Sequence, residues 1–171
     1  MQLGSQPYSG GPALLRNFGS KEMKSILLNG EWDSEYSIKN NLGICNVKFT
    51  ESKLFPGGPN EVSELITCVG FPRLVLILSG SGYCLTVDNR EDSPYNGQPT
   101  IFRMIASKEE GVFVPKGFSV GLVFSTPNCL FLEIGNSEAI YSEPIDPFSA
   151  KISFDVACGI SEKKLTLYSK E

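Results

Sequence analysis

The sequence of 171 residues contains no histidine. Histidine supplies the imidazole ligand of many zinc and iron sites, and it is the base of Ser-His-Asp and Cys-His catalysis. All of these sites are therefore excluded. Any acid–base chemistry in this chain has to use another side chain.

A surplus of positive charge is also missing, because the formal net charge is -4. Nucleic-acid-binding domains are usually basic, so we expect no nucleic-acid partner, although one or two arginines are enough to bind a phosphate. No apolar stretch approaches 18 residues, and no charged segment followed by an apolar run opens the chain. We therefore expect no membrane partner and place the protein in the cytoplasm.

Metal-binding cysteine patterns are absent as well. The five cysteines are not spaced as C-x-x-C, and most lie in apolar runs such as "LITCVG" and "NCLFLEI". These positions favour reduced thiols in the core of a cytoplasmic protein over metal ligands. We expect neither a metal nor another cofactor.

What the sequence does contain is a series of short apolar runs separated by Gly, Pro, Asn, Ser and Asp. Residues 1–20 are rich in Gly, Ser and Pro and predict an irregular N-terminal arm, and residues 21–171 predict a single domain. From "KSILLNG" to "AKISFDVACG" the runs have strand length, and no useful helical periodicity is visible. The pattern predicts an all-β sandwich or barrel.

The run "GYCLTVD" illustrates how such a strand divides into two faces. Cys84 and Thr86 share one face, and Leu85 and Val87 share the other. The small, semi-polar face is suited to border a cavity, and the aliphatic face is suited to packing between sheets. The alternative is that both faces are simply the two sides of a sandwich strand.

Two segments together resemble the nucleotide-sugar 3,5-epimerase family, the dTDP-4-dehydrorhamnose epimerases of the cupin fold. The first is "RLVLILSGSGYCLTVDNREDSPYNGQPT", and the second is "GVFVPKGFSVGL". They match the family's V-D-x-R-x-x-S-P-x-x-G strand end and its P-x-G-F-A-H-G-F corner at Asp88, Arg90, Ser93, Pro94, Gly97, Pro115, Gly117, Phe118 and Gly121. The resemblance implies a cupin-type jelly-roll β-barrel built as a double-stranded antiparallel sandwich.

Family members invert a carbon beside the carbonyl of a 4-keto sugar nucleotide by removing and returning a proton. In the family a histidine is the base, a tyrosine is the proposed acid, and the lysine of a K-L-V run steadies the oxyanion. At the matching positions this chain has Ser63 and Val120 for the two family histidines, Arg73 for the lysine and Glu133 for the tyrosine. The usual mechanism of the family therefore cannot operate here.

Glu133, Arg73 and Tyr141 are the candidate catalytic residues. Glu133 can act as a base if it is partly desolvated, Arg73 can hold an enolate or a phosphate, and Tyr141 can replace the missing acid. The alternatives are a buried ion pair or solvated rim residues for the first two, and a tyrosine at a subunit contact for the third.

Ser63, Cys84, Lys116 and Trp32 are the candidate substrate-binding residues. Ser63 and Cys84 are expected at the cavity, Lys116 at a corner from which it can reach a phosphate, and Trp32 in a segment that the family lends to a neighbouring subunit. The resemblance also implies a homodimer, matches Asn29 to a family arginine that binds substrate, and matches Glu171 to the aspartate that orients the family's histidine.

The sequence thus predicts a divergent protein that binds a nucleotide-linked keto-deoxysugar. It either epimerises this ligand by proton abstraction beside the 4-keto group without histidine, or it is a catalytically inactive cupin that acts as a ligand-binding or scaffold homodimer. Convergence of Glu133 and Arg73 in an open, polar cavity favours the enzyme, whereas a cavity filled by side chains favours the scaffold.

Overall fold

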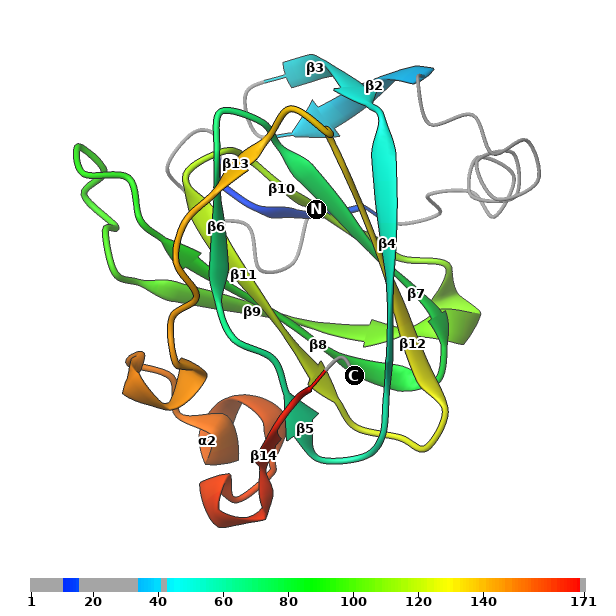
Figure 1. The fold of residues 1–171 in the computed structure, drawn as a ribbon, viewed down its shortest axis with the longest axis vertical. Coiled ribbons are helices and arrows are strands. Elements are labelled where there is room, and N and C mark those ends of the chain that lie inside the picture. Colours follow the sequence, from blue (N-terminus) through cyan, green and yellow to red (C-terminus); the bar gives the residue numbers. More distant parts are fainter. Residues whose placement is uncertain (1–10, 16–33, 41–42, 170–171) are drawn as a thin grey trace.

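The computed structural model describes residues 11–15, 34–40 and 43–169 and consists mainly of β-strands. Two sheets pack face to face, and a separate two-stranded hairpin lies beside one end of them (Figure 1). The hairpin strands are β2 (Ser34–Asn40) and β3 (Gly43–Phe49). The prediction of a mostly β, two-sheet architecture is confirmed.

The first sheet has five strands, all antiparallel. In spatial order they are β1 (Ala13–Leu15), β10 (Gly111–Val114), β7 (Arg73–Ser79), β12 (Cys129–Gly135) and β4 (Glu51–Gly57). Strand β1 lies inside residues 1–20, for which the sequence predicts an irregular arm. These three residues form a strand because their backbone pairs with β10.

The second sheet has seven strands. Along its main path they are β13 (Ile140–Tyr141), β6 (Ile66–Val69), β11 (Phe118–Phe124), β5 (Glu61–Val62) and β14 (Thr166–Leu167), and β8 (Ser81–Asp88) joins β11 to β9 (Pro99–Ile105).

Two details of the predicted barrel need correction. The two sheets are joined by no strand pairing in the described part of the chain, so they do not close into a barrel. The pairing is also not purely antiparallel, because β14 runs parallel to β5.

The run "AKISFDVACG" is not a strand, as its composition had indicated, but contains the helix α2 (Phe154–Cys158). Phe154 and Cys158 are buried one helical turn apart, whereas Val156 between them is 86% exposed. Gly159 ends the helix with a φ of 68°, a conformation that glycine adopts readily. Three 3₁₀ helices lie at Ala106–Lys108, Pro147–Ser149 and Glu162–Lys164. None of the described helices is long and apolar enough to cross a membrane.

The main core fills the space between the two sheets, and a second cluster lies on the outer side of the second sheet beneath the C-terminal segment. Strand β8 contributes to both, with Cys84 in the main core and Leu85 and Val87 in the outer cluster. This assignment corrects the predicted use of the two faces. The C-terminal segment covers the outer face, so the aliphatic side of β8 is buried there.

The V-D-x-R-x-x-S-P segment, which carries part of the family resemblance, stabilises a turn of the fold. The carboxylate of Asp88 has no exposed surface and accepts hydrogen bonds from Arg90 Nε at 3.0 Å, Arg90 Nη2 at 2.8 Å and Ser93 Oγ at 2.6 Å. Gly117 has a φ of 89°, and a β-carbon there would meet the Arg90 side chain at 2.7 Å. Asp88 therefore fixes the β8–β9 turn against the corner before β11.

Candidate functional site

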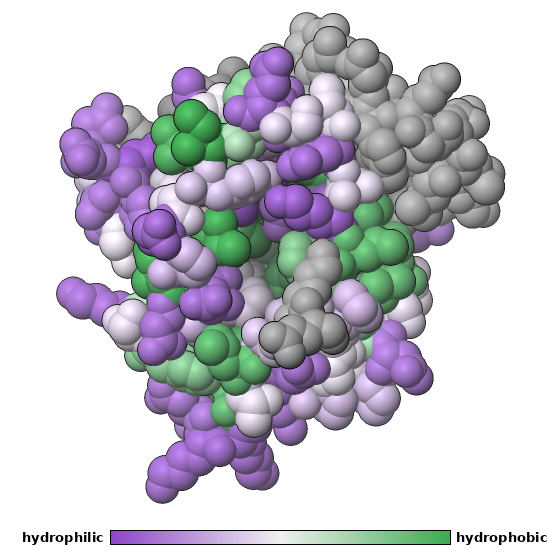
Figure 2. Space-filling view, viewed as in Figure 1, coloured by the Kyte–Doolittle hydropathy of each residue, from purple (hydrophilic) through white to green (hydrophobic). Residues whose placement is uncertain are grey.

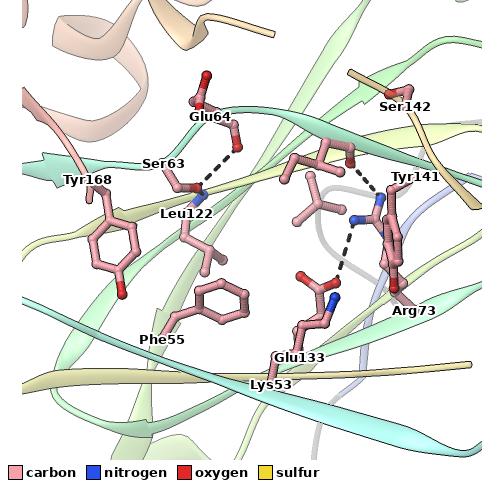
Figure 3. A pocket seen from close by; sticks show the side chains of 12 residues that line it. Lys53, Phe55, Ser63, Glu64, Arg73, Leu122, Glu133, Tyr141, Ser142 and Tyr168 are labelled. Carbon is pink, nitrogen blue, oxygen red and sulfur yellow. Dashed lines mark hydrogen bonds and ion pairs between the residues drawn. The ribbon is translucent and has the colours of Figure 1, made fainter. Parts of the chain in front are cut away.

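A cavity of about 380 Å³ lies between the two sheets. Its volume falls within the range of about 300–1,000 Å³ that is usual for small-molecule sites. Figure 2 shows the corresponding face of the molecule hollowed near its centre. One end of the cavity is polar, with Lys53, Arg73, Glu133 and Tyr141, and the other end is mainly apolar (Figure 3).

Arg73 begins β7 and is only 1% exposed. Its Nη2 donates to the backbone oxygens of Ile66 at 2.9 Å and Phe118 at 2.7 Å, and these bonds tie β7 to two strands of the opposite sheet. Its Nη1 lies 3.7 Å from Glu133 Oε1. Its Nε is buried and has no hydrogen-bond partner among the described residues. The guanidinium therefore belongs to the wall of the cavity.

Glu133 lies in the middle of β12 and is placed by the register of two neighbouring strands. It is opposite Val75 of β7 and opposite Lys53 of β4. Its side chain is 12% exposed, and Figure 3 shows its carboxylate pointing into the cavity beside the ammonium of Lys53. Glu133 thus presents a carboxylate that a ligand can reach, and the guanidinium of Arg73 lies beside it in the cavity wall.

Tyr141 comes from β13, on the opposite sheet from Glu133. Its hydroxyl donates to Glu51 Oε1 at 3.4 Å, and Lys53 Nζ lies 4.5 Å from the centre of its ring. Burial, and next the nearby charge of Glu133, raises the pKa of Tyr141 above its ordinary value near 10. The phenol therefore keeps its proton at neutral pH.

The two positions matched to family histidines both line the cavity. Ser63 Oγ accepts a hydrogen bond from the Leu122 backbone N–H at 2.7 Å, so it links the loop after β5 to β11. Val120 is 4% exposed and packs into the main core. Neither side chain can act as a base. The other polar side chains that line the cavity are those of Lys53, Glu64, Arg73, Glu133, Tyr141, Ser142 and Tyr168.

The apolar end of the cavity contains aromatic residues that no sequence motif marks. Tyr168 stacks on Phe124 with ring centres 4.7 Å apart, and Phe55 lies 6.5 Å from Tyr168 by the same measure. Figure 3 shows Phe55, Leu122 and Tyr168 together on this side. An aromatic pair formed by β4 and the last described residues is a long-range contact, so no local motif marks it.

Other predicted site residues lie elsewhere. Cys84 has no exposed surface and packs in the main core, so its thiol is not part of the cavity wall. Lys116 is exposed at the corner before β11 and is not among the lining residues. Trp32 and Glu171 lie outside the described residues, as does Asn29. Within the described ranges, no group of three Cys, Asp or Glu side chains is arranged to hold a metal ion.

The polar end can therefore serve as an acid–base site without histidine. It combines a reachable carboxylate, a protonated phenol and two cations around one space. A carboxylate can accept a proton, a phenol can give one, and a nearby cation stabilises an oxyanion. Lys53 completes this group and was not predicted from the sequence.

Comparison with known proteins gives matches among solved structures alone, since no protein-family model and no curated protein sequence matches the chain. The dTDP-4-dehydrorhamnose 3,5-epimerase of Elizabethkingia anophelis superimposes with a TM-score of 0.67 at 15% identity, over 99% of this chain and 92% of that one. The dTDP-6-deoxy-D-glucose-3,5-epimerase of Legionella pneumophila, in complex with dTDP-4-keto-L-rhamnose, gives 0.59 at 14% identity, over 97% and 87%.

A third match is ChmJ, a 3'-monoepimerase from Streptomyces bikiniensis in complex with dTDP-quinovose. It gives a TM-score of 0.62 at 13% identity, over 97% of this chain and 83% of that one. At identities this low, the matches carry information on the fold alone. The matched fold agrees with the family resemblance found in the sequence. The chain has the fold of the dTDP-sugar 3,5-epimerases.

Proposed function

We propose that this protein binds a nucleotide-linked keto-deoxysugar in the cavity and moves a proton beside the sugar carbonyl, with Glu133 as the base. The observation that carries the proposal is the convergence of Glu133, Tyr141 and two cations at one end of an unfilled cavity. The shared fold supports the ligand class, because its structural neighbours are epimerases of dTDP-linked sugars.

The proposed reaction needs a base, an acid and a cation. The Glu133 carboxylate takes the proton from the carbon next to the carbonyl, and the electron pair of that C–H bond moves onto the carbonyl oxygen. A cation of the polar end faces the resulting oxyanion. Tyr141, which comes from the opposite sheet, gives its proton to the other face of the carbon and becomes a phenolate. Glu133 then releases its proton to water and the phenolate of Tyr141 takes one from water, which restores the starting state.

The two ends of the cavity give the ligand a direction. The keto group is expected at the polar end, where charges can act on it. The rings of Phe55 and Tyr168 offer flat, apolar surface to the rest of the ligand, to which a sugar ring or a nucleobase can pack.

The test is proton exchange followed by NMR, with purified protein, a dTDP-4-keto-6-deoxy sugar and deuterated water. We expect the proton signals beside the carbonyl to disappear with wild-type protein. They should persist with Glu133→Gln, which keeps the shape of the side chain and loses the base. Glu138→Gln is the matched control, because Glu138 is exposed in the loop after β12 and outside the cavity. Exchange no faster than in protein-free buffer refutes the catalytic proposal.

The alternative is a ligand-binding homodimer without catalysis, and one observation favours it. Arg73 Nη1 lies 3.7 Å from Glu133 Oε1, and such an ion pair can serve to join strands instead of taking part in chemistry. This alternative expects the sugar nucleotide to raise the melting temperature without any proton exchange. Light scattering of the same sample measures the oligomeric state, for which a homodimer is our prediction.

A further inference from the structure

We propose that Lys53 is the residue that holds the carbonyl oxygen of the ligand as negative charge develops on it, and that Arg73 positions Glu133 instead. This inference rests on the proposed function and deepens it. It assigns the cation of the reaction to a strand, β4, in which the sequence motifs place no functional residue.

Arg73 is fixed in the wall of the cavity and is poorly placed to follow a ligand. Its Nη2 makes two short hydrogen bonds to backbone oxygens, its Nη1 faces Glu133, and its Nε is buried. The whole residue is 1% exposed. This guanidinium would have to break its two bonds to the opposite sheet before it could move toward a ligand.

Lys53 is placed differently from Arg73. Its side chain is 42% exposed, and its ammonium lies 3.9 Å from Glu51 Oε1, which is longer than a hydrogen bond. An ammonium carries three N–H donors on a flexible stem. A loose ion pair therefore leaves Lys53 able to turn toward a ligand at little cost.

Lys53 also lies next to both groups that would move protons. It is directly opposite Glu133 in the pairing of β12 with β4, and its Nζ lies 4.5 Å from the ring centre of Tyr141. Figure 3 shows its ammonium pointing into the cavity beside the Glu133 carboxylate. A carbonyl oxygen at the Lys53 ammonium thus brings the neighbouring carbon toward Glu133.

The arrangement gives the two cations separate tasks. Arg73 is a positioning residue: it pairs with the Glu133 carboxylate from the cavity wall and joins the two sheets through its hydrogen bonds. Lys53 touches the reacting atoms and acts on the oxyanion, which is present only while the proton is off the carbon. Removing Lys53 should therefore slow the reaction more than it weakens binding.

The experiment combines proton exchange with binding calorimetry, both with a dTDP-4-keto-6-deoxy sugar as the probe. Loss of one donor to an oxyanion typically slows a reaction by about 100-fold or more, so we expect that loss for Lys53→Gln, with a Kd within about threefold of wild type. Lys53→Arg keeps the charge and should exchange faster than Lys53→Gln. Lys151→Gln is the matched control, since Lys151 is exposed and outside the cavity.

Three outcomes would overturn the inference, and they are distinguishable. If Lys53→Gln exchanges as fast as wild type, another group holds the oxyanion. If its Kd rises by as much as its exchange rate falls, Lys53 binds the ligand uniformly, as a phosphate contact would. If wild-type protein shows no exchange, the proposed function fails, and the role of Lys53 fails with it. Unfolding in urea checks that the variant is folded.

Discussion

Replacing Arg73 by methionine should lower the free energy of unfolding by about 3–5 kcal/mol, the usual cost of removing one member of a buried ion pair. Methionine fills the space of the aliphatic stem but provides no donor. The substitution removes two hydrogen bonds from a charged donor, each of which is typically worth about 1.5–3 kcal/mol. It also leaves Glu133, which is 12% exposed, without the cation at 3.7 Å.

The assay is urea denaturation followed by fluorescence or circular dichroism. For an m-value of about 2 kcal/mol per M, the expected loss lowers the midpoint by about 1.5–2.5 M. Arg103→Met is the control, because Arg103 is exposed on β9, and such surface changes usually stay within about 0.5 kcal/mol. The double variant Arg73→Met/Glu133→Gln should recover about 1 kcal/mol or more, because no unpaired carboxylate remains.

The reasoning is refuted if Arg73→Met loses less than about 1 kcal/mol, the worth of one ordinary hydrogen bond. It is also refuted if the effects of the two single variants simply add, since residues in one network are expected to be coupled. The first result would mean that the bonds of Arg73 to the opposite sheet contribute little, and the second that Arg73 does not hold Glu133 in solution.

Two further predictions concern protonation. Asp88→Asn should cost about 3 kcal/mol at pH 7, near the low end for a buried pair because Arg90 retains some contact with water. Burial alone would raise the pKa of Asp88, but hydrogen bonds from Arg90 and Ser93 outweigh it and hold the pKa below the ordinary value of 3.8. The stabilisation is therefore complete above about pH 3.8 and is lost as the pH falls below it; a difference between wild type and variant that stays constant down to pH 2 contradicts this. Tyr141→Phe should slow epimerisation by about 100-fold or more, as expected for loss of a general acid, and the wild-type rate should not fall between pH 7 and 9, because burial and then Glu133 raise the pKa of Tyr141. NMR of the product measures the rate of the Tyr141→Phe variant and the pH dependence of the wild-type rate. An unchanged rate in the variant excludes Tyr141 as the acid.

Much of the fold can be read from local sequence. Turn residues such as Gly97 and Gly117 have positive φ values, so their spacing reports where strands end. Alternation along "GYCLTVD" shows that β8 has two faces, but it does not tell which face meets the other sheet. The helix at Phe154–Cys158 was missed because five residues are too few to distinguish helical from strand periodicity.

The candidate site could be predicted only in part, for a physical reason. Arg73 and Glu133 lie in runs that the family resemblance aligns, and the register of β7 and β12 brings them together. The pairing of β4 with β12 places Lys53 beside Glu133, although the two residues are 80 positions apart in the sequence. No local motif in "ESKLFPGG" predicts this contact. Tyr168 reaches the cavity through the parallel pairing of β14 with β5, which is equally non-local. The cytoplasmic location stays a prediction.

The central claim is that a keto sugar binds with its reacting carbon beside Glu133. The most direct measurement is a crystal structure of the Glu133→Gln variant with a dTDP-4-keto-6-deoxy sugar. The account predicts the sugar in the cavity, with the carbon next to the carbonyl about 3–3.5 Å from the side chain at position 133, as in a near-attack geometry, and with the carbonyl oxygen at Lys53. A sugar bound outside the cavity, or with its carbonyl at the aromatic end beside Tyr168, would contradict it.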